Sequence, residues 1–376
     1  MIPFNKPYIA GKELDYIQQA IANLHLSGDG LFSHKSQSWL EQELAVPKVL
    51  LTASCTDALE MTALLLDIKP GDEVIVPAFT FPSTINAFVL RGARPVFIDI
   101  RADTLNLDET ELEPLITPRT KAIVVMHYAG IGCEMEVILK IARAHGIPVI
   151  EDNAHGLFGK YQQKYLGTFG SLATLSFHET KNFICGEGGA LLINDPKYIE
   201  RAEIIREKGT DRSRFFRGQV DKYTWVDVGS SFLLSDILAA FLYAQLEARE
   251  IIQAQRKRVW VYYYENLKDW AGNSGVRLPI VPENCAQPYH MFHLIMNSLE
   301  ERAALISHLQ AQQVNAIFHY QPLHLSSMGQ RLSQPSDCPV AEAVSHQLLR
   351  LPFYNDMTEA EQSQVVASVK SFGLAP

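Results

Sequence analysis

Short apolar runs that alternate with segments of helical spacing constrain the fold of this chain more than any other feature. Helix candidates separate the runs, for example at residues 54–66, 83–90 and 135–145. Such alternation is typical of βαβ units, in which a mostly parallel sheet carries helices on both faces. The seven runs lie at residues 49–51, 74–76, 95–98, 122–126, 148–150, 172–177 and 190–193. We therefore expect an α/β fold.

The second half of the chain has a different pattern. Residues 234–266 contain no glycine or proline and predict one helix, longer than is usual in globular proteins, that joins two domains. We expect a large domain at residues 1–245 and a smaller α/β domain at residues 246–376. In the smaller domain the pattern predicts a strand at 291–296 and helices at 301–312 and 359–371.

Composition excludes several classes of protein. The net charge is −9, so the chain lacks the basic surface that neutralises nucleic-acid phosphates. Its five cysteines have no CxxC spacing, which favours reduced thiols over a disulfide framework or a zinc site, and no metal site is expected. No apolar run approaches about 18 residues, and the N-terminus lacks the apolar region of a signal peptide. We expect a cytoplasmic protein with no nucleic-acid or membrane partner.

One lysine stands between two of the predicted strands. Lys181 follows the run at 172–177, which ends near Ser176, and precedes the glycine-rich segment before the run at 190–193. Burial lowers the pKa of a lysine, and a neutral amine is the form that attacks carbonyl groups to form Schiff bases. For a lysine considered alone, a position on an exposed hairpin is the commoner explanation.

Polar and aromatic residues follow other runs, where the predicted strands end. In sheets of this type, ligands bind at the carboxyl ends of the strands. Ser54, Cys55 and Thr56 open a helix whose free N–H groups and dipole suit a phosphate, although simple N-capping is the commoner explanation. Phe81 follows the next run and is suited either to stacking on a planar ligand or to the core.

Asp152 and His155 follow the run at 148–150. A carboxylate at a buried strand end needs a partner, because an unpaired buried charge is costly. The alternatives are a helix N-cap, a salt bridge, or the cationic nitrogen of a heteroaromatic ligand.

Together these residues meet the requirements of pyridoxal phosphate. The cofactor needs an amine, phosphate donors, a stacking aromatic and an acid that keeps its pyridine nitrogen protonated. Lys181 supplies the amine, and Asp152 precedes it by 29 residues. A nicotinamide cofactor is disfavoured, because Gly28-Asp29-Gly30 lacks the third glycine of the dinucleotide fingerprint and does not follow a strand.

With these residues, the chain closely resembles the DegT/DnrJ/EryC1/StrS sugar aminotransferases, which are fold type I enzymes dependent on pyridoxal phosphate. The resemblance covers nearly the whole chain, from Asn-Lys-Pro at residues 5–7 to Tyr-Gln-Pro-Leu-His at 320–324 and the final helices. The stretch at residues 204–225 carries much of it. The resemblance implies a homodimer with active sites at the subunit interface.

The resemblance also implies roles for the cofactor-binding residues. Lys181 bonds the aldehyde of the cofactor and then moves the proton during transamination. Asp152 holds the pyridinium nitrogen, Phe81 stacks on the ring, and His155 lies near the phenolic oxygen. The phosphate is bound by Cys55, Thr56 and Ser176.

One position departs from the family pattern. Many relatives carry Gly-x-Asn-x-Arg after a long loop, and the asparagine reaches the phosphate of the neighbouring subunit. Here the stretch is Gly-Ser-Ser-Phe-Leu at residues 229–233, so Ser231 occupies that place. The shorter hydroxyl puts this contact in doubt.

The reaction implied is a two-stage transamination of a nucleotide-linked 4-keto-6-deoxyhexose with L-glutamate as amino donor. The neighbour's loop at 214–222, including Lys222, lies near the substrate diphosphate in this prediction. The sugar pocket is expected to include Gly28, His127, Tyr128, Tyr320 and His324.

Several alternatives stay open. The sequence does not distinguish amination at C3 from C4, the two C4 epimers, or dTDP from UDP. Ordinary loop polarity explains His319 and His324 about equally well. A non-catalytic regulatory relative is disfavoured by the presence of Lys181, as is a deoxysugar dehydratase, in which histidine replaces that lysine. The sequence assigns no role to His178 or Glu179.

Overall fold

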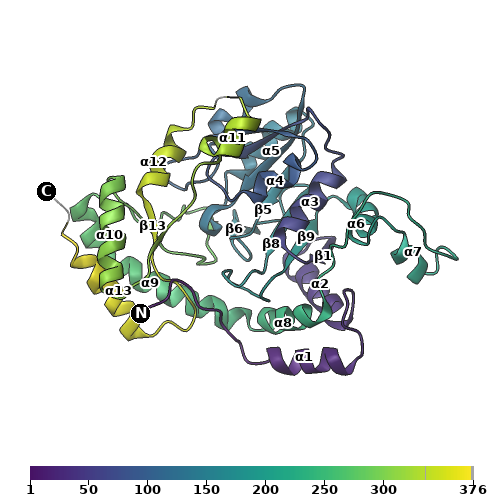
Figure 1. Cartoon of the computed structure of the whole chain (residues 1–376), viewed down its shortest axis with the longest axis horizontal. Coiled ribbons are helices and arrows are strands. Elements are labelled where there is room, and N and C mark those ends of the chain that lie inside the picture. The colour runs from purple at the N-terminus through teal and green to yellow at the C-terminus, as the bar shows by residue number, and fades with distance from the viewer. Residues whose placement is uncertain (335, 374–376) are drawn as a thin grey trace.

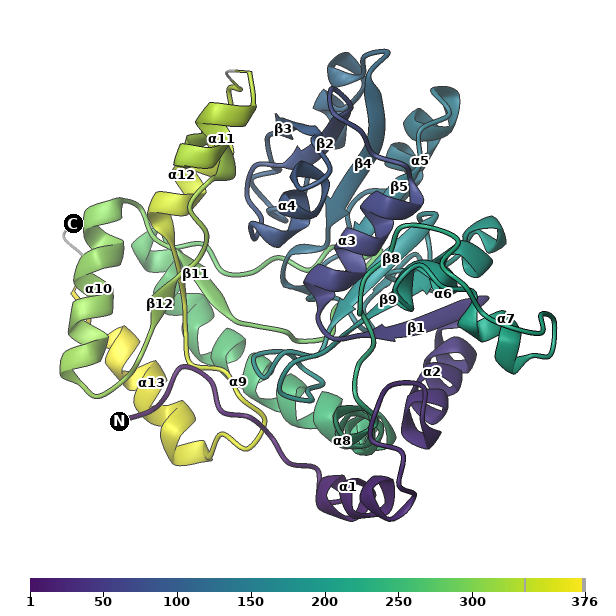
Figure 2. The ribbon, with the colours of Figure 1, turned by 45° about the vertical axis from the view of Figure 1, so that its right-hand side comes forward.

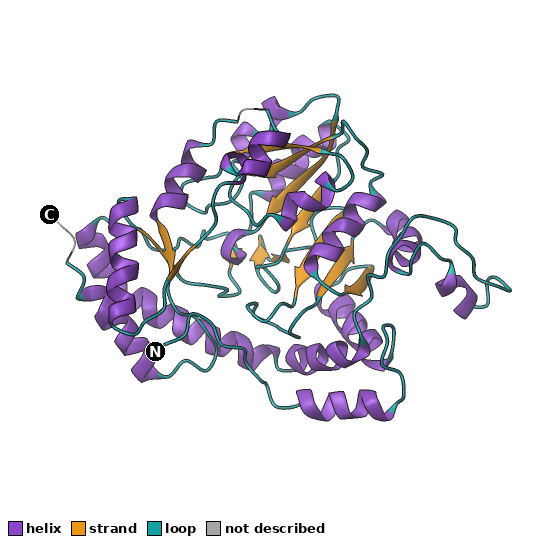
Figure 3. Cartoon of the chain, in the orientation of Figure 1, coloured by secondary structure: helices purple, strands orange, loops and turns teal. Residues whose placement is uncertain are grey.

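The structure is a computed structural model that describes residues 1–334 and 336–373. A seven-stranded sheet in the order β1-β9-β8-β5-β4-β2-β3 forms its centre (Figures 1 and 3). Neighbouring strands are parallel except where β9 pairs with β8 and with β1. The strands are β1 (Lys48–Thr52), β2 (Glu73–Pro77), β3 (Arg94–Ile98), β4 (Thr120–Met126), β5 (Val149–Asp152), β8 (Leu172–Ser176) and β9 (Gly189–Ile193). Each coincides with one predicted apolar run, and the predicted α/β fold is confirmed.

Helices cover both faces of this sheet, as the nearly continuous apolar strands require. Successive residues of a strand point to opposite faces, so Val74 and Val76 pack with α3, α4 and α6 while Ile75 packs with α5. At the other end of the sheet, Leu51 and Leu175 pack with α2 and α8. The helices are α1 (Glu13–Ala22), α2 (Leu31–Leu44), α3 (Cys55–Leu65), α4 (Ser83–Val89), α5 (Met135–Ala144), α6 (Ile199–Arg206), α7 (Arg212–Phe216) and α8 (Asp236–Glu247).

The predicted helix at 234–266 is wrong in its continuity. Two helices, α8 and α9 (Arg249–Ser274), meet at Ala248, whose backbone N–H bonds to carbonyls of α8. This junction contains no glycine or proline, so the local sequence gave no signal of a helix break. The second helix continues to Gly275, which ends it in a left-handed conformation with φ of 70°. Figure 2 shows α8 and α9 running from the large sheet to the C-terminal part.

The C-terminal part is built on a three-stranded antiparallel sheet in the order β11-β13-β12. One face packs against α9, α10 and α13, and Ile295 and Leu348 on the other face join the core of the large sheet. Its elements are β11 (His293–Ile295), α10 (Leu299–Ala311), β12 (Ile317–Phe318), α11 (Ser327–Leu332), α12 (Pro339–Gln347), β13 (Leu348–Arg350) and α13 (Glu359–Lys370). The predicted strand and both predicted helices of this region are therefore present.

A second small sheet ties the two parts together. β10 (Cys285–Ala286) pairs with β6 (Lys160–Tyr161), which pairs with β7 (Lys164–Tyr165). The first residues of the chain also pack on the C-terminal part, since Ile2 bridges to Val314 and lies in its core. The boundary near residue 245 stays a prediction, but residues 2–4 lie with the C-terminal sheet rather than with the large domain.

Short 3₁₀ helices fill several connections. They are η1 (Glu109–Glu111), η2 (Glu113–Leu115), η3 (Tyr128–Gly130), η4 (Pro196–Tyr198) and η5 (Leu323–Leu325). Among the described residues, none of the helices combines the length and the apolar character needed to cross a membrane.

Candidate active site

Lys181 lies on the connection between β8 and β9. Backbone hydrogen bonds fold this connection tightly, because the N–H of Lys181 donates to the carbonyl of His178 and that of Cys185 donates to Phe177. Burial lowers the pKa of Lys181; nearby Cys55 and Asp152 oppose the shift, and the charge of Arg350 adds to it. The environment therefore shifts the amine toward its neutral form, which is the nucleophilic form.

Asp152 ends β5 on the strand next to β8, so its carboxylate reaches the same edge of the sheet as Lys181. It accepts hydrogen bonds from the Thr84 hydroxyl at 2.7 Å and the Ala154 N–H at 3.2 Å. The Thr84 hydroxyl is also within 2.8 Å of Thr80. Burial raises the pKa of Asp152, so a cationic partner in the site would help to keep this carboxylate ionised.

The start of α3 has a geometry that suits an anion. Ser54 caps the helix by accepting the N–H of Asp57 at 3.0 Å, and the first N–H groups of the helix remain free for a ligand. Gly189 of β9 pairs with Ser176 on one side and Thr52 on the other. A Cβ at Gly189 would lie 2.4 Å from the backbone nitrogen of Cys55, so only glycine allows β9 this close to the helix start.

The side chains near the start of α3 also suit a bound phosphate and a planar ring. Burial raises the pKa of the Cys55 thiol to about 12, so this residue offers its backbone N–H and a neutral side chain. The Thr56 hydroxyl donates to Ser83 at 2.9 Å. Phe81, at the carboxyl end of β2, leaves 55% of its surface exposed although it is a large apolar residue. Its ring lies 6.2 Å from that of Tyr320, and an exposed aromatic at this edge is available to stack on a planar ligand.

Rings from both parts of the chain form the wall beside Phe81. The imidazoles of His155 and His290 stack at 4.2 Å, and the Tyr320 hydroxyl is 3.5 Å from Nε2 of His155. The Nδ1 atom of His155 is buried and has no hydrogen-bond partner. Burial lowers the pKa of His155 well below its usual value, so the ring is neutral and retains an unused polar atom. The Tyr128 hydroxyl completes the wall at 2.7 Å from Nδ1 of His319.

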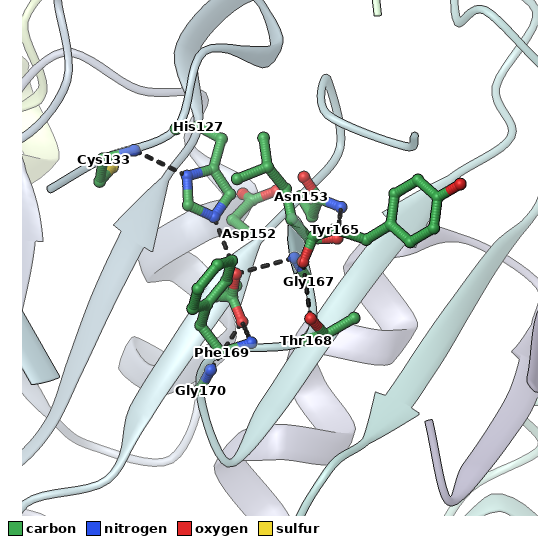
Figure 4. A network of polar contacts seen from close by, with 12 residues as sticks. His127, Cys133, Asp152, Asn153, Tyr165, Gly167, Thr168, Phe169 and Gly170 are labelled. Carbon is green, nitrogen blue, oxygen red and sulfur yellow. Dashed lines mark hydrogen bonds and ion pairs between the residues drawn. The ribbon is translucent and has the colours of Figure 1, made fainter. Parts of the chain in front are cut away.

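The structure does not bring His127 to an open surface. Its side chain is fully buried; one ring nitrogen lies 2.9 Å from Glu151 and the other accepts the Cys133 N–H at 3.2 Å. The same carboxylate accepts the N–H groups of Gly167, Phe169 and Gly170 at 2.7 Å each (Figure 4). With both ring nitrogens engaged, His127 orders the loops behind the site and does not face the predicted sugar pocket.

Other predicted substrate residues have local partners. His324 lies 3.0 Å from Glu342. A Cβ at Gly28 would lie 2.8 Å from the carbonyl of Leu234, so packing within the chain is sufficient to explain this glycine. Ser231 and Lys222 are exposed on the segment at residues 209–232, from which α7 projects at the right of Figure 1. These positions leave their predicted substrate and phosphate contacts untested within one chain.

Three residues at the site escaped the sequence analysis. Thr84 donates a hydrogen bond to Asp152, His290 stacks on His155, and the positive charge of Arg350 adds to the lowering of the Lys181 pKa. A charged residue within the apolar stretch at 348–353 was the available signal for Arg350.

His178 and Glu179, which had no assigned role, have structural contacts. His178 lies 2.9 Å from the Thr180 hydroxyl, and the carbonyl of Glu179 accepts Nδ2 of Asn5 at 3.2 Å. Both contacts shape the connection that carries Lys181.

Comparisons with known proteins agree with this geometry. The sequence profile of the DegT/DnrJ/EryC1/StrS aminotransferase family matches residues 7–370. An uncharacterized protein of Methanocaldococcus jannaschii is 35% identical over 325 residues, which are 84% of this chain and 83% of that protein.

Solved structures show the same fold. An aminotransferase, TlmJ, from Streptoalloteichus hindustanus is 28% identical with a TM-score of 0.90 and coverage of 99% of this chain and 98% of its own. A protein of Streptococcus pneumoniae named as a sugar aminotransferase is 26% identical; its PMP form has a TM-score of 0.91, with 99% of this chain and 98% of its own covered. The same protein in its PLP form has a TM-score of 0.90, with 98% of each chain covered.

The residues present suit pyridoxal phosphate. A lysine of lowered pKa, a buried carboxylate on the adjacent strand, a helix start with free N–H groups and an exposed aromatic converge on one edge of the sheet. The predicted enzyme class and cofactor are confirmed by the family match and the related structures. The chain belongs to the DegT/DnrJ/EryC1/StrS aminotransferase family of pyridoxal phosphate-dependent enzymes.

Proposed function

We propose that this enzyme transfers the amino group of L-glutamate to the keto carbon of a nucleotide-linked 4-keto-6-deoxyhexose. The observation that carries the proposal is the convergence of Lys181, Asp152 and the start of α3 at the carboxyl edge of the sheet. Pyridoxal phosphate bound there supplies an electron sink for the carbon that loses its proton. The protein's own part is to hold that cofactor and to move a proton at Nζ of Lys181, whose lowered pKa suits a general base.

Each cofactor contact is proposed for a residue whose position supports it. The carboxylate of Asp152 would hold the pyridinium nitrogen, and Phe81 would cover one face of the ring. His155, with its unused Nδ1, would lie near the phenolic oxygen. Phosphate binding is proposed for the Cys55 and Thr56 backbone N–H groups and the hydroxyl of Ser176, with Ser231 of a second subunit as a further contact.

The sugar pocket is proposed on the wall that joins the two parts of the chain. Tyr128 and Tyr320 present hydroxyl groups beside the cofactor residues, and both come from connections near the sheet edge. His324 would act at the rim of this pocket and Gly28 at its entrance. His127 is left out, because both of its ring nitrogens are already engaged.

We also propose a homodimer with shared sites, which the projecting segment at residues 209–232 supports. Its apolar side chains include Phe216, which is 70% exposed, and Trp225, which is 75% exposed. Arg214 and Arg217 pair with glutamates of α6, whereas Lys222 is exposed on the loop and would face the substrate diphosphate of the partner. We also propose that the enzyme is cytoplasmic, in keeping with its five free cysteines.

The specific product that we propose is dTDP-4-amino-4,6-dideoxygalactose, formed from dTDP-4-keto-6-deoxyglucose, a step of polysaccharide biosynthesis. The sequence at residues 204–225 supports it, because this stretch resembles the transaminase of enterobacterial common antigen synthesis. Amination at C3, or formation of the other C4 epimer, is the alternative within the same family. A non-catalytic regulatory protein is disfavoured by the presence of Lys181 and Asp152 together.

The test is product analysis. The holoenzyme is incubated with dTDP-4-keto-6-deoxyglucose and L-glutamate, and the sugar product is characterised by NMR. The proposal expects an axial amine at C4, with 2-oxoglutarate formed in equal amount, and no product from Lys181→Ala. An equatorial amine at C4 would replace the proposed product with the other C4 epimer. A holoenzyme that reacts with glutamate but does not convert this 4-keto sugar would favour amination at C3, which needs a substrate with its keto group at C3. A wild-type holoenzyme whose cofactor spectrum does not respond to glutamate would refute the transaminase itself.

A further inference from the structure

Asn182 and His290 form a polar contact between the two parts of the chain. Asn182 follows Lys181 directly on the connection between β8 and β9, whereas His290 lies 108 residues later, just before β11. Oδ1 of Asn182 is 2.8 Å from Nδ1 of His290, and Nδ2 of Asn182 donates to the carbonyl of Pro288 at 2.7 Å. Both side chains are buried. One amide group therefore fastens the connection that carries Lys181 to the segment before β11.

This contact fixes the tautomer of His290. A backbone carbonyl only accepts, so the bond to Pro288 identifies the amide nitrogen of Asn182 and leaves the amide oxygen facing the imidazole. Nδ1 of His290 must then carry a proton and donate it. Burial lowers the pKa of His290 well below its usual value, so the ring is neutral and Nε2 carries no proton. The amide thus selects one orientation and one protonation state of the ring.

The backbone that carries His290 is held from a second side. Arg256 of α9 donates to the carbonyls of Tyr289 and His290 at 2.9 and 2.6 Å. Tyr289 has a φ of 54°, in the left-handed region that residues other than glycine rarely adopt. Such a conformation costs energy and persists only where the surrounding structure fixes it. Arg256 and Asn182 together hold His290 in one place beside the site.

The ring of His290 stacks on the ring of His155. The centroids are 4.2 Å apart and the planes are inclined by 23°. Burial lowers the pKa values of both imidazoles well below the usual value, so the two rings are neutral and no charge repels them. Nδ1 of His155 is buried without a hydrogen-bond partner, and Nε2 is 3.5 Å from the Tyr320 hydroxyl. Among the described residues no shorter hydrogen bond holds the imidazole of His155, so the stack with His290 sets its plane.

We propose that Asn182 and His290 are positioning residues: Asn182 anchors His290, and the anchored ring holds His155 where it meets the phenolic oxygen of the cofactor. This inference rests on the proposed contact of His155 and deepens it. A donor at that oxygen stabilises the negative charge there and weakens its pull on a proton at Nζ of Lys181. The pair would therefore make Nζ give up its proton more readily, without touching the cofactor itself.

The experiment titrates the absorbance of the bound cofactor with pH, without glutamate or sugar. Asn182→Ala, His290→Ala and His290→Phe are compared with the wild-type holoenzyme. The band at about 400–430 nm reports the proton at Nζ of Lys181. The pH at which half of this band is lost should rise by about one unit in the variants, as expected when a hydrogen bond to a charged group is weakened. His290→Phe keeps a planar ring but cannot donate to Asn182, so this variant separates anchoring from the filling of space.

His155→Leu tests whether the pair acts through His155. This variant should itself raise the midpoint, and His290→Ala should add no further shift when it is combined with His155→Leu. His308→Phe is the matched control. His308 also belongs to the C-terminal part, but its Nε2 lies 3.0 Å from the carbonyl of Ser368, between α10 and α13. Its midpoint should equal that of wild type.

A second measurement uses the cofactor-free proteins. Urea unfolding of Asn182→Ala, His290→Phe and the double variant shows whether the two side chains act as a unit. Each single variant already breaks their hydrogen bond, so the double variant should lose less stability than the sum of the two single losses. Additive losses would overturn the contact on which the positioning role depends.

An unmoved midpoint in Asn182→Ala or in His290→Phe would overturn the role of the pair, because a purely structural contact would give that result. A His290→Ala shift that persists in full beside His155→Leu would overturn the route through His155. An unmoved midpoint in His155→Leu alone would overturn both the positioning role and the proposed contact of His155.

Failure of the proposed function gives a different result. If wild type does not respond to glutamate, transamination is refuted, while the pH titration, which needs no glutamate, still decides the positioning role. If His290→Ala does not fold, His290→Phe and Asn182→Ala decide it by the same titration.

Discussion

Replacing His127 by leucine would test whether this histidine supports the fold or contacts the substrate. In the structure, Nδ1 accepts the Cys133 N–H, so Nε2 carries the proton and donates to Glu151 at 2.9 Å. Leucine loses both contacts. A hydrogen bond to a charged group contributes about 1.5–3 kcal/mol, and a buried N–H without an acceptor costs about 1–3 kcal/mol. The variant should therefore be destabilised by about 2.5–6 kcal/mol.

In His127→Leu, Glu151 would keep its three backbone N–H donors. The loss of stability should therefore be smaller than that caused by leaving a buried charge without any partner. His127→Gln, which can still donate to Glu151, should lose about half as much as His127→Leu. His145→Leu is the control, because His145 is 38% exposed and pairs with an exposed glutamate; its effect should be below about 1 kcal/mol.

The assay is urea unfolding of the cofactor-free proteins, followed by circular dichroism, together with steady-state kinetics. We expect His127→Leu to lower the unfolding midpoint, with little change in KM for the sugar nucleotide in the molecules that remain folded. An unchanged midpoint with a raised KM would refute the structural role and return His127 to the sugar pocket.

Three further predictions address the site. Lys181→Ala should abolish transamination and the cofactor absorbance at about 400–430 nm; a variant that keeps this band would exclude Lys181 as the bonding residue. Thr84→Val removes the hydroxyl that donates to Asp152 at 2.7 Å, which should raise the pKa of Asp152 further and weaken cofactor binding more at pH 6 than at pH 8. A fluorescence titration of the cofactor at the two pH values would measure the difference. Burial lowers the pKa of His293 to about 3, so the folded state binds fewer protons than the unfolded state between about pH 3 and 6.5. The free energy of unfolding should therefore fall as the pH drops below 6.5, and this residue should contribute a loss of about 2 kcal/mol at pH 5. Urea unfolding of wild type and His293→Phe at pH 7 and pH 5 measures this loss. Equal losses in the two proteins would contradict the prediction.

Local pattern was enough for the central sheet. Each apolar run became a strand, because a strand buried on both faces requires continuous apolar residues wherever it lies. It was not enough for the helix predicted at 234–266, since the break at Ala248 has no glycine or proline and follows from how α8 and α9 pack.

The candidate site was also predictable only in part. Lys181, Asp152 and the start of α3 could be predicted because the carboxyl ends of parallel strands meet at one edge, whatever the details of packing. His127 also follows a strand, yet its side chain turns inward to Glu151. Strand-end position therefore identified the edge but not the direction of each side chain.

The sequence by itself determined the order of strands and helices, the lysine and acid at their ends, and the family of the enzyme. Only the tertiary structure decided which polar groups become partners, as Thr84 does for Asp152 and His290 for His155. Those partners are 68 residues apart in the first pair and lie in different parts of the chain in the second. Arg350 is a further case, because its Nε is buried without a hydrogen-bond partner among residues 1–334 and 336–373, a state that arises only when the segments around it pack together. Burial and pairing are properties of packing between distant segments, and no local spacing encodes them.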